Sequence, residues 1–503
     1  MKLNYLALIL VHPILPVTTE TQLNQDAWTA IMAHLPPKEA SLVSRSSRIL
    51  RQANQNQPWL RAQVHIFCPS DFVHALWYHD RPLITGSCTT TRRRSRAAVR
   101  ITMNQLSGDC LTALHAYCRL TAPYRCGSVH VHVHGFLLND EPADDCALFE
   151  QWPDCFKLTA FQGSMYELQC LRHRPSRARH VSRMSLSCLN VDVPYPEMVS
   201  ALDRTLYIVL GSMRQLSSLS ISGCRPGIHV LIDGLRLSLV LSPSVVRLRR
   251  LSLTDIGLRA QDVQSLASLI TQQFLPLHHL DLSWNPLGDD AVPYLEHVLH
   301  SLVPSLRSLR LSHLQLQTAG WTQMSVAISK ITLLQHLDLS MNFMGSFIAT
   351  TVFFTAFQNK PGLQRLKLSG NVLGPSAAHS ISICLQRLPA LQYLDLSLNH
   401  LQTQGFKALC QRLRYSSLQV LDVSRNRIGT GEGWSDVADA LKMAVTLRTV
   451  MMDGNVLQVG EVLSLMKSVT QVKFWSFRGL IASEEDRSRL HAQTEQGNVT
   501  VEL

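Results

Sequence analysis

Three stretches decide the fold: LHHLDLSWNPLG at residues 277–288, LQHLDLSMNFMG at 334–345 and LQYLDLSLNHLQ at 391–402. They share the frame L-x-x-L-x-L-x-x-N-x-L. Further copies begin at residues 248, 306, 363, 418 and 447, so that from 248 onward the copies start 27 to 29 residues apart. Weaker copies begin at 181 and 216. A fixed period of this length predicts an array of stacked repeats.

Each part of the frame has an expected structural role. Leucines at positions 1, 4 and 6 point inward from a short strand and stack on the same positions of the next copy. The stretches between strands, such as 260–270 and 405–413, carry apolar residues at helical spacing. At position 9 we expect an inward amide that satisfies backbone groups of the turn leaving the strand, namely that of Asn285, Asn342, Asn371, Asn399, Asn426 and Asn455.

The frame, with a helix in every repeat, resembles the ribonuclease-inhibitor class of leucine-rich repeats over about residues 181–480. The resemblance implies an α/β solenoid shaped like a horseshoe, with a parallel sheet inside and helices outside. Positions 3 and 5 flank the inward leucine at position 4, so we expect them to face a protein ligand from the concave side. The expected ligand-binding residues, with Trp284, Arg365 and Tyr393 as anchors, are Arg250, His279, Trp284, Arg310, His336, Arg365 and Tyr393.

Aspartates recur at position 5 on the same exposed face, at Asp281, Asp338, Asp395 and Asp422. They recur because the repeat recurs, and even spacing along a sheet is unlike a converging catalytic site. The sequence also lacks a P-loop, a G-x-S-x-G elbow, an H-E-x-x-H motif and a dinucleotide fingerprint. We therefore expect a protein that is not an enzyme and that needs no cofactor.

The frame decays outside this core. Residues 99–103 and 129–135 alternate like strands and are interpreted as degenerate early repeats within a region 66–180. A last strand is expected at 469–474 in the array of residues 181–482, and the polar tail 483–503 is expected to cover the final apolar face.

Residues 20–65 follow a different pattern, that of a short helical module. Pro36-Pro37 ends a first helix and a second amphipathic run spans 40–50. The order of residues resembles an F-box, with Asn24 in place of the family's usual proline: Leu23, Asp26, Ile31, Leu35-Pro36, Lys38-Glu39, Ser44, Arg48 and Trp59. The resemblance implies docking onto a Skp-type adaptor, through Leu23, Trp28, Ile31, Leu35, Pro36, Leu42 and Val43. Alternatively, the helices only cap the array.

Composition narrows the possible partners. The chain has 503 residues, is 46% hydrophobic and 17% charged, and carries a net charge of +11, which favours acidic partners without indicating a dedicated nucleic-acid binder. The arginines at 92–96 and 172–183 are interpreted as solvated loops, or contacts to acidic protein or phosphate, rather than readers of bases. Its 12 cysteines include no C-x-x-C pair, so we expect free thiols in the cytoplasm or nucleus.

Two short segments leave alternatives open. His130, His132 and His134 would share one strand face, but the first and last lie about 13 Å apart, so a solvated polar stripe is favoured over a metal site. Residues 1–19 form either an N-terminal extension or a targeting segment, since the apolar run 3–17 is interrupted and lacks a cleavage motif. The run is too short to span a membrane.

These features predict an adaptor: a monomeric substrate-recognition subunit of a cullin-type ubiquitin ligase, whose repeats hold an unknown substrate protein. A structural or scaffolding role in a larger assembly is the alternative. A GTPase-regulating role, by resemblance to Ran GTPase-activating proteins with repeats of similar period, is a third. We expect no membrane contact and no nucleic acid.

Overall fold

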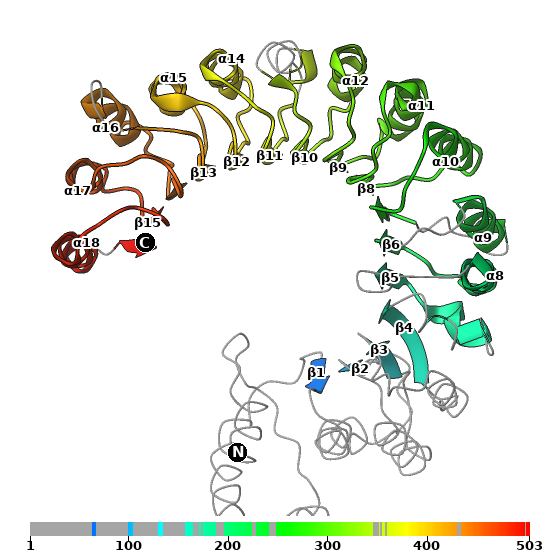
Figure 1. Cartoon of the computed structure of the whole chain (residues 1–503). Helices are drawn as coiled ribbons and strands as arrows, with labels where there is room; N and C mark the ends of the chain where they lie inside the picture. The colour runs from blue at the N-terminus through cyan, green and yellow to red at the C-terminus, as the bar shows by residue number, and fades with distance from the viewer. Residues whose placement is uncertain are drawn as a thin grey trace, which may run out of the picture. The chain divides into compact units, whose positions relative to one another are not determined.

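The structure is a computed structural model of the chain (Figure 1). It describes residues 63–66, 99–103, 129–133, 156–163, 168, 171–172, 175–187, 196–223, 228–240, 248–345, 352, 355–357, 360–429, 434–497 and 499–502. The chain divides into two compact units, the first made of residues 1–185 and 212–215 and the second of residues 186–211 and 216–503.

The first unit contains parallel strands. β1 (Gln63–Ile66), β2 (Val99–Met103), β3 (Val129–Val133) and β4 (Phe156–Gly163) each pair with the next one along the chain, with a register shift after Val131. The alternating stretches at 99–103 and 129–133 therefore form strands, as predicted, whereas β4 was not predicted. β1 begins within the last residues of the range 20–65 assigned to the helical module.

The second unit alternates strands and helices. Its strands are all parallel and pair in chain order: β6 (Ser218–Ser222), β7 (Arg250–Thr254), β8 (His279–Asp281), β9 (Ser308–Arg310), β10 (His336–Asp338), β11 (Arg365–Lys367), β12 (Tyr393–Asp395), β13 (Val420–Asp422), β14 (Thr449–Met451), β15 (Phe474–Ser476) and β16 (Thr500–Glu502). This confirms the parallel-sheet solenoid predicted from the frame.

Helices connect these strands. They are α8 (Pro196–Ser212), α9 (Ile228–Val240), α10 (Ala260–Gln272), α11 (Val292–Leu302), α12 (Thr318–Ser329), α14 (Pro375–Leu385), α15 (Gln402–Leu413), α16 (Trp434–Lys442), α17 (Val459–Ser468) and α18 (Glu484–Gly497). In the second unit the strands line the inner side of a curve and the helices its outer side (Figure 1). We call the strand side the inner face.

The core of the second unit lies between strands and helices. Leucines at position 4, from Leu251 to Leu421, pair across adjacent strands and are at most 1% exposed. The helices turn a buried stripe toward the core, as α10 does with Val263, Leu266 and Ile270 at the spacing of one helix face. Burying each such side chain contributes about 1.5–3 kcal/mol, so the repeated leucines are the main source of stability.

The asparagines at position 9 are buried and connect adjacent turns, as predicted. In Asn399, Oδ1 accepts the backbone N–H groups of Asn371 and Leu373 at 2.9 and 3.0 Å. Its Nδ2 donates to the carbonyls of Leu368 and Leu396 at 3.0 and 2.9 Å. Asn342, Asn371, Asn426 and Asn455 repeat this pattern and form a ladder through the core.

The C-terminal end differs in detail from the prediction. The last strand of the frame, β15, begins at Phe474 rather than spanning 469–474. Residues 483–503 are more than a polar tail, because they contain α18 and a strand, β16, that pairs in parallel with β15. On α18, Leu490 is fully buried.

Two further observations concern the cysteines and the helices. Cys384 and Cys410 are free and buried, and burial raises the pKa of the Cys384 thiol to about 11, which keeps it protonated and unreactive at neutral pH. Across the part of the chain that the structure describes, no helix is long and apolar enough to cross a membrane.

Candidate protein-binding face

The strand register arranges the predicted residues in two rows on the inner face. In the first row, at position 3, Arg250 pairs with His279, His279 with Ser308, Ser308 with His336, His336 with Arg365, and Arg365 with Tyr393. The second row, at position 5, contains Asp281, Arg310, Asp338, Lys367 and Asp395. Because neighbouring strands are about 4.8 Å apart, a ligand lying across the strands meets a new side chain of each row at every turn.

The aspartates at position 5 also hold the turn that follows each strand. Their Oδ1 atoms accept the backbone N–H of the serine two residues later, at 3.1 Å for Asp281 and Asp338 and 2.9 Å for Asp422. Asp395 accepts both the N–H and the hydroxyl of Ser397, and is only 9% exposed. The expectation that the Asp395 side chain is exposed is therefore wrong, because its carboxylate is bonded into its own turn.

A second feature of the face is the rim formed by position 8, just after each strand. Trp284, His313, Met341, Leu398 and Arg425 all have left-handed backbone conformations, with φ between 53° and 63°. The N–H of each one donates to the position-7 carbonyl of the next turn, which continues the sheet ladder past the strands. Left-handed backbone costs a bulky residue about 1–2 kcal/mol relative to glycine.

Large apolar side chains nevertheless lie on this rim. Trp284 is 48% exposed and stacks on His313 with 4.8 Å between ring centroids, and Leu398 is 47% exposed. At position 10, Phe343 and Val372 are also left-handed and exposed. Exposed apolar residues at strained positions are typical of interaction sites rather than of a scaffold alone. The sequence frame singled out Trp284 but gave no signal for the backbone strain.

Tyr393 and Arg365 form one polar pair in the first row. The Arg365 guanidinium carbon lies 5.9 Å from the centroid of the Tyr393 ring. Burial, followed by the carboxylates of Asp395 and Asp422, raises the pKa of Tyr393 to about 12, so its hydroxyl remains a hydrogen-bond donor at any physiological pH. The pair presents a flat aromatic surface beside a cation, which suits a protein ligand.

Histidines and arginines dominate the turns from β7 to β10. Burial, then the neighbouring Arg249, Arg307 and Arg250, lower the pKa of His278. Burial is also the largest cause that lowers the pKa of His279, followed by Arg250 and other cations of the face. For His336 burial is again the largest cause that lowers the pKa, followed by Arg365. These imidazoles are therefore mostly neutral at pH 7.

Several predicted residues lie elsewhere. The adaptor-binding residues Leu23 to Val43 are outside the described residues, as are His134 and the arginines at 92–96. Only the backbone of His130 and His132 is described, in β3. The 172–183 cluster includes a 3₁₀ helix at Pro175–His180, so it is not simply a loop. Among the described side chains, no group of histidine, cysteine, aspartate and glutamate is arranged to hold a metal.

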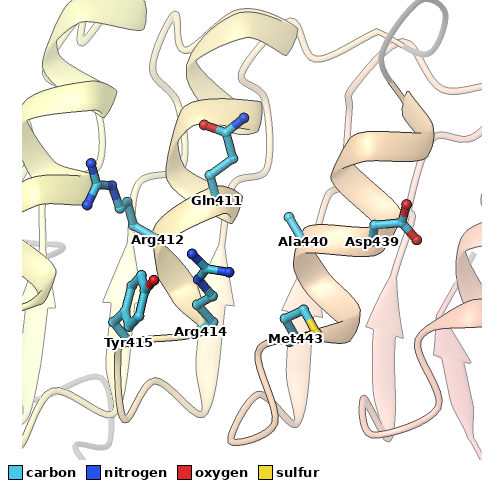
Figure 2. A pocket seen from close by; sticks show the side chains of 7 residues that line it. All are labelled: Gln411, Arg412, Arg414, Tyr415, Asp439, Ala440 and Met443. Carbon is cyan, nitrogen blue, oxygen red and sulfur yellow. The ribbon is translucent and has the colours of Figure 1, made fainter.

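A groove between two outer helices was not predicted. Figure 2 shows the end of α15, with Gln411, Arg414 and Tyr415, on one side of the groove, and Asp439 and Met443 of α16 with its following turn on the other. Its volume is about 530 Å³, and the Arg414 guanidinium lies 4.5 Å from the centroid of the Tyr415 ring. Helical periodicity places these residues outside the core but carries no information on the gap between neighbouring helices.

Comparison with known proteins supports the repeat assignment. A family model described as Leucine Rich repeat matches residues 276–292 and 388–410. The chain is 30% identical over 253 residues to "NACHT, LRR and PYD domains-containing protein 5" of Homo sapiens, which covers 50% of this chain and 20% of that protein. It is 27% identical over 286 residues to the ribonuclease inhibitor of Sus scrofa, covering 56% of this chain and 61% of that protein.

Among solved structures, an internalin from Listeria monocytogenes aligns with a TM-score of 0.37 and 14% identity, over 69% of this chain and 84% of that chain. The chain spans about a fifth of the length of the first NACHT relatives. The sequence matches to the NACHT proteins and to the ribonuclease inhibitor support homology to leucine-rich repeats of the ribonuclease-inhibitor type. These matches give no support for the F-box resemblance, which stays a prediction.

Proposed function

We propose that this chain is a protein-recognition subunit whose inner face holds a folded protein or a peptide. The observation that carries the proposal is the register of the first row, which places Arg250, His279, His336, Arg365 and Tyr393 on successive turns of one face. Trp284 adds an exposed aromatic ring at the edge of the same face. Arginine, tyrosine and tryptophan are the residue types that anchor protein interfaces.

We further propose that residues 20–65 dock onto the Skp-type adaptor of a cullin ubiquitin ligase. The support for this step is the F-box-like residue order from Leu23 to Trp59, placed before a repeat array. In this role the inner face holds the protein to be ubiquitinated. A scaffolding role is the second candidate, because the names of the NACHT relatives place such repeats in larger multidomain proteins.

Deleting residues 20–62 tests the adaptor role and spares β1, which begins at Gln63. We expect the deletion to abolish co-purification with a purified Skp-type adaptor while circular dichroism and the thermal melt stay close to those of the full chain. The array should stay folded because repeat stability comes mainly from neighbouring repeats. Continued binding of the adaptor would contradict the proposal, and aggregation of the shortened chain would favour a capping role.

A triple variant tests the inner face. Replacing Trp284, Arg365 and Tyr393 by alanine should weaken the partner's affinity by at least about 100-fold, because anchors of this kind each contribute on the order of 1–2 kcal/mol. The matched control replaces Phe274, Arg387 and Tyr415, which follow α10, α14 and α15, by alanine. Quantitative co-purification from cells, then titration of the identified partner, measures both. An equal loss of affinity in the triple variant and in its control would show that the inner face is not the binding site.

A further inference from the structure

One edge of the inner face concentrates positive charge. The basic edge consists of Arg249, Arg250, His278, His279 and Arg307, at positions 2 and 3 of the turns β7 to β9. Backbone hydrogen bonds fix these turns side by side: the N–H of His279 donates to the Arg249 carbonyl at 3.0 Å, and that of Ser308 to the His278 carbonyl at 2.9 Å. The three arginines are exposed, whereas the two histidines are half-buried.

The charge of this edge is not neutralised within the described part of the chain. The nearest ion pair is that of Arg310 with Asp281, at 3.5 Å, and none of the described carboxylates pairs with Arg249, Arg250 or Arg307. Among the described residues, the Arg249 guanidinium donates a hydrogen bond to the Pro276 carbonyl, at 3.2 Å, rather than to a carboxylate. Burial, and after it the neighbouring cations, lower the pKa of both histidines, and the cationic contribution agrees with like charges lying close together here.

We propose that the basic edge binds an anionic stretch of a protein partner, one that carries carboxylates or phosphates. The guanidinium fork matches both groups in a two-point geometry. An extended chain advances about 3.3 Å per residue, so three residues span about 10 Å. Two strand spacings of about 4.8 Å cover the same distance. An anion at every third residue of the partner would therefore meet every second turn of the array. The inference rests on the proposed function only in taking the inner face as the recognition surface.

The edge is less suited to nucleic acid. Proteins that bind single strands combine positive charge with aromatic side chains on which bases stack. The basic edge itself contains no aromatic residue besides its two histidines, and these are half-buried between arginines. The neighbouring carboxylate of Asp281 would also repel a continuous phosphate backbone.

Labelled peptides on the full-length chain test the proposal by fluorescence anisotropy. The probes are four repeats of Gln-Gln-Ser, the same peptide with glutamate at the first position of each repeat, the same peptide with phosphoserine, and a single-stranded oligonucleotide of equal charge. We expect an anionic peptide to bind, the neutral peptide not to bind, and affinity to fall as salt rises. The tighter anionic peptide identifies the source of the charge as carboxylate or phosphate.

Variants locate the site. Replacing Arg250 and Arg307 by glutamine should weaken the anionic peptides at least 10-fold, whereas the control pair Arg387→Gln and Arg412→Gln, on the helix side, should have no effect. Between pH 7.5 and 6.0 the affinity for the glutamate peptide should rise several-fold, since a bound anion favours protonated His278 and His279 beside Arg249, Arg250, Arg307 and Arg310. Replacing both histidines by glutamine should remove this rise.

Three results would overturn the inference: equal binding of the neutral peptide, an unchanged affinity in the Arg250 and Arg307 variant, or tighter binding of the oligonucleotide than of either anionic peptide. The outcome is separate from that of the proposed function. If the Trp284, Arg365 and Tyr393 variant loses its partner while the basic-edge variant binds peptides like the wild type, only this inference fails.

Discussion

Replacing Asn399 by alanine is expected to lower the free energy of unfolding by about 2–4 kcal/mol, because a buried polar group without a partner costs about 1–3 kcal/mol. The change removes the acceptor of two backbone N–H groups, those of Asn371 and Leu373, from a site that is only 1% exposed. It also removes one of the two side-chain donors to the Leu396 carbonyl, which keeps the Nδ2 group of Asn426. Urea unfolding followed by circular dichroism measures the loss.

Two further variants make this prediction specific to the ladder. Gln392→Ala changes an exposed side chain of the same turn and should alter stability by no more than about 0.5 kcal/mol. The amides of Asn371 and Asn399 both donate to the Leu368 carbonyl, at 3.0 Å each. In either single variant the Leu368 carbonyl keeps one of these two donors, whereas in the double variant it has lost both. The loss of unfolding free energy in the double variant should therefore exceed the sum of the losses in the two single variants by about 1 kcal/mol. Strict additivity would mean that solvent reaches the ladder.

The repeat frame predicted the features that every turn shares. It placed the leucines of β7 to β13 inward and the Asn399 amide in the core, and it put Arg250, His279, His336, Arg365 and Tyr393 in one row. These predictions succeed because the stacking of identical turns imposes the same environment on the same position. The inner face as a candidate binding surface could therefore be predicted from the sequence alone.

Features that depend on two unlike neighbouring turns could not be predicted. Asp395 is only 9% exposed and is bonded to Ser397 of its own turn, while the frame treats all position-5 aspartates alike. The left-handed backbone at Leu398 is a different case, because it recurs at position 8 of successive turns, but side-chain periodicity does not report backbone conformation. The groove beside Tyr415 depends on the spacing of α15 and α16.

Lys360 is another feature without a sequence signal, and it gives the stability a dependence on pH. Its side chain is fully buried, and Nζ donates to the carbonyl of Ser329, the last residue of α12, at 2.8 Å. The C-terminal end of a helix, where the backbone carbonyls carry partial negative charge, favours a cation. Burial nevertheless dominates and lowers the pKa of the ammonium to about 8, from 10.5. The folded state therefore releases the proton at a lower pH than the unfolded state.

The sign of the effect follows from proton counts. Between about pH 8 and 10.5 the unfolded chain binds more protons at Lys360 than the folded chain, so this group stabilises the fold progressively as pH rises. The full shift corresponds to at most about 3 kcal/mol. Burial raises the pKa of Cys384 to about 11 and of Tyr393 to about 12, and these groups act in the opposite direction above about pH 9. The contribution of Lys360 must therefore be isolated by comparison with a variant.

Lys360→Met keeps most of the buried side-chain volume and removes the titrating amine. At pH 7 we expect the variant to be at least as stable as the wild type, because the cost of burying a charge disappears along with one hydrogen bond. Between pH 7 and 9.5 the free energy of unfolding of the wild type should then rise by about 2 kcal/mol relative to that of the variant. Urea midpoints at half-unit steps of pH measure it, and the contributions of Cys384 and Tyr393 cancel because both proteins contain them.

Lys330→Met, at an exposed lysine directly after α12, should leave the wild-type pH dependence intact. Parallel curves for wild type and Lys360→Met would show that the amine keeps its ordinary pKa and is reached by water in the folded protein.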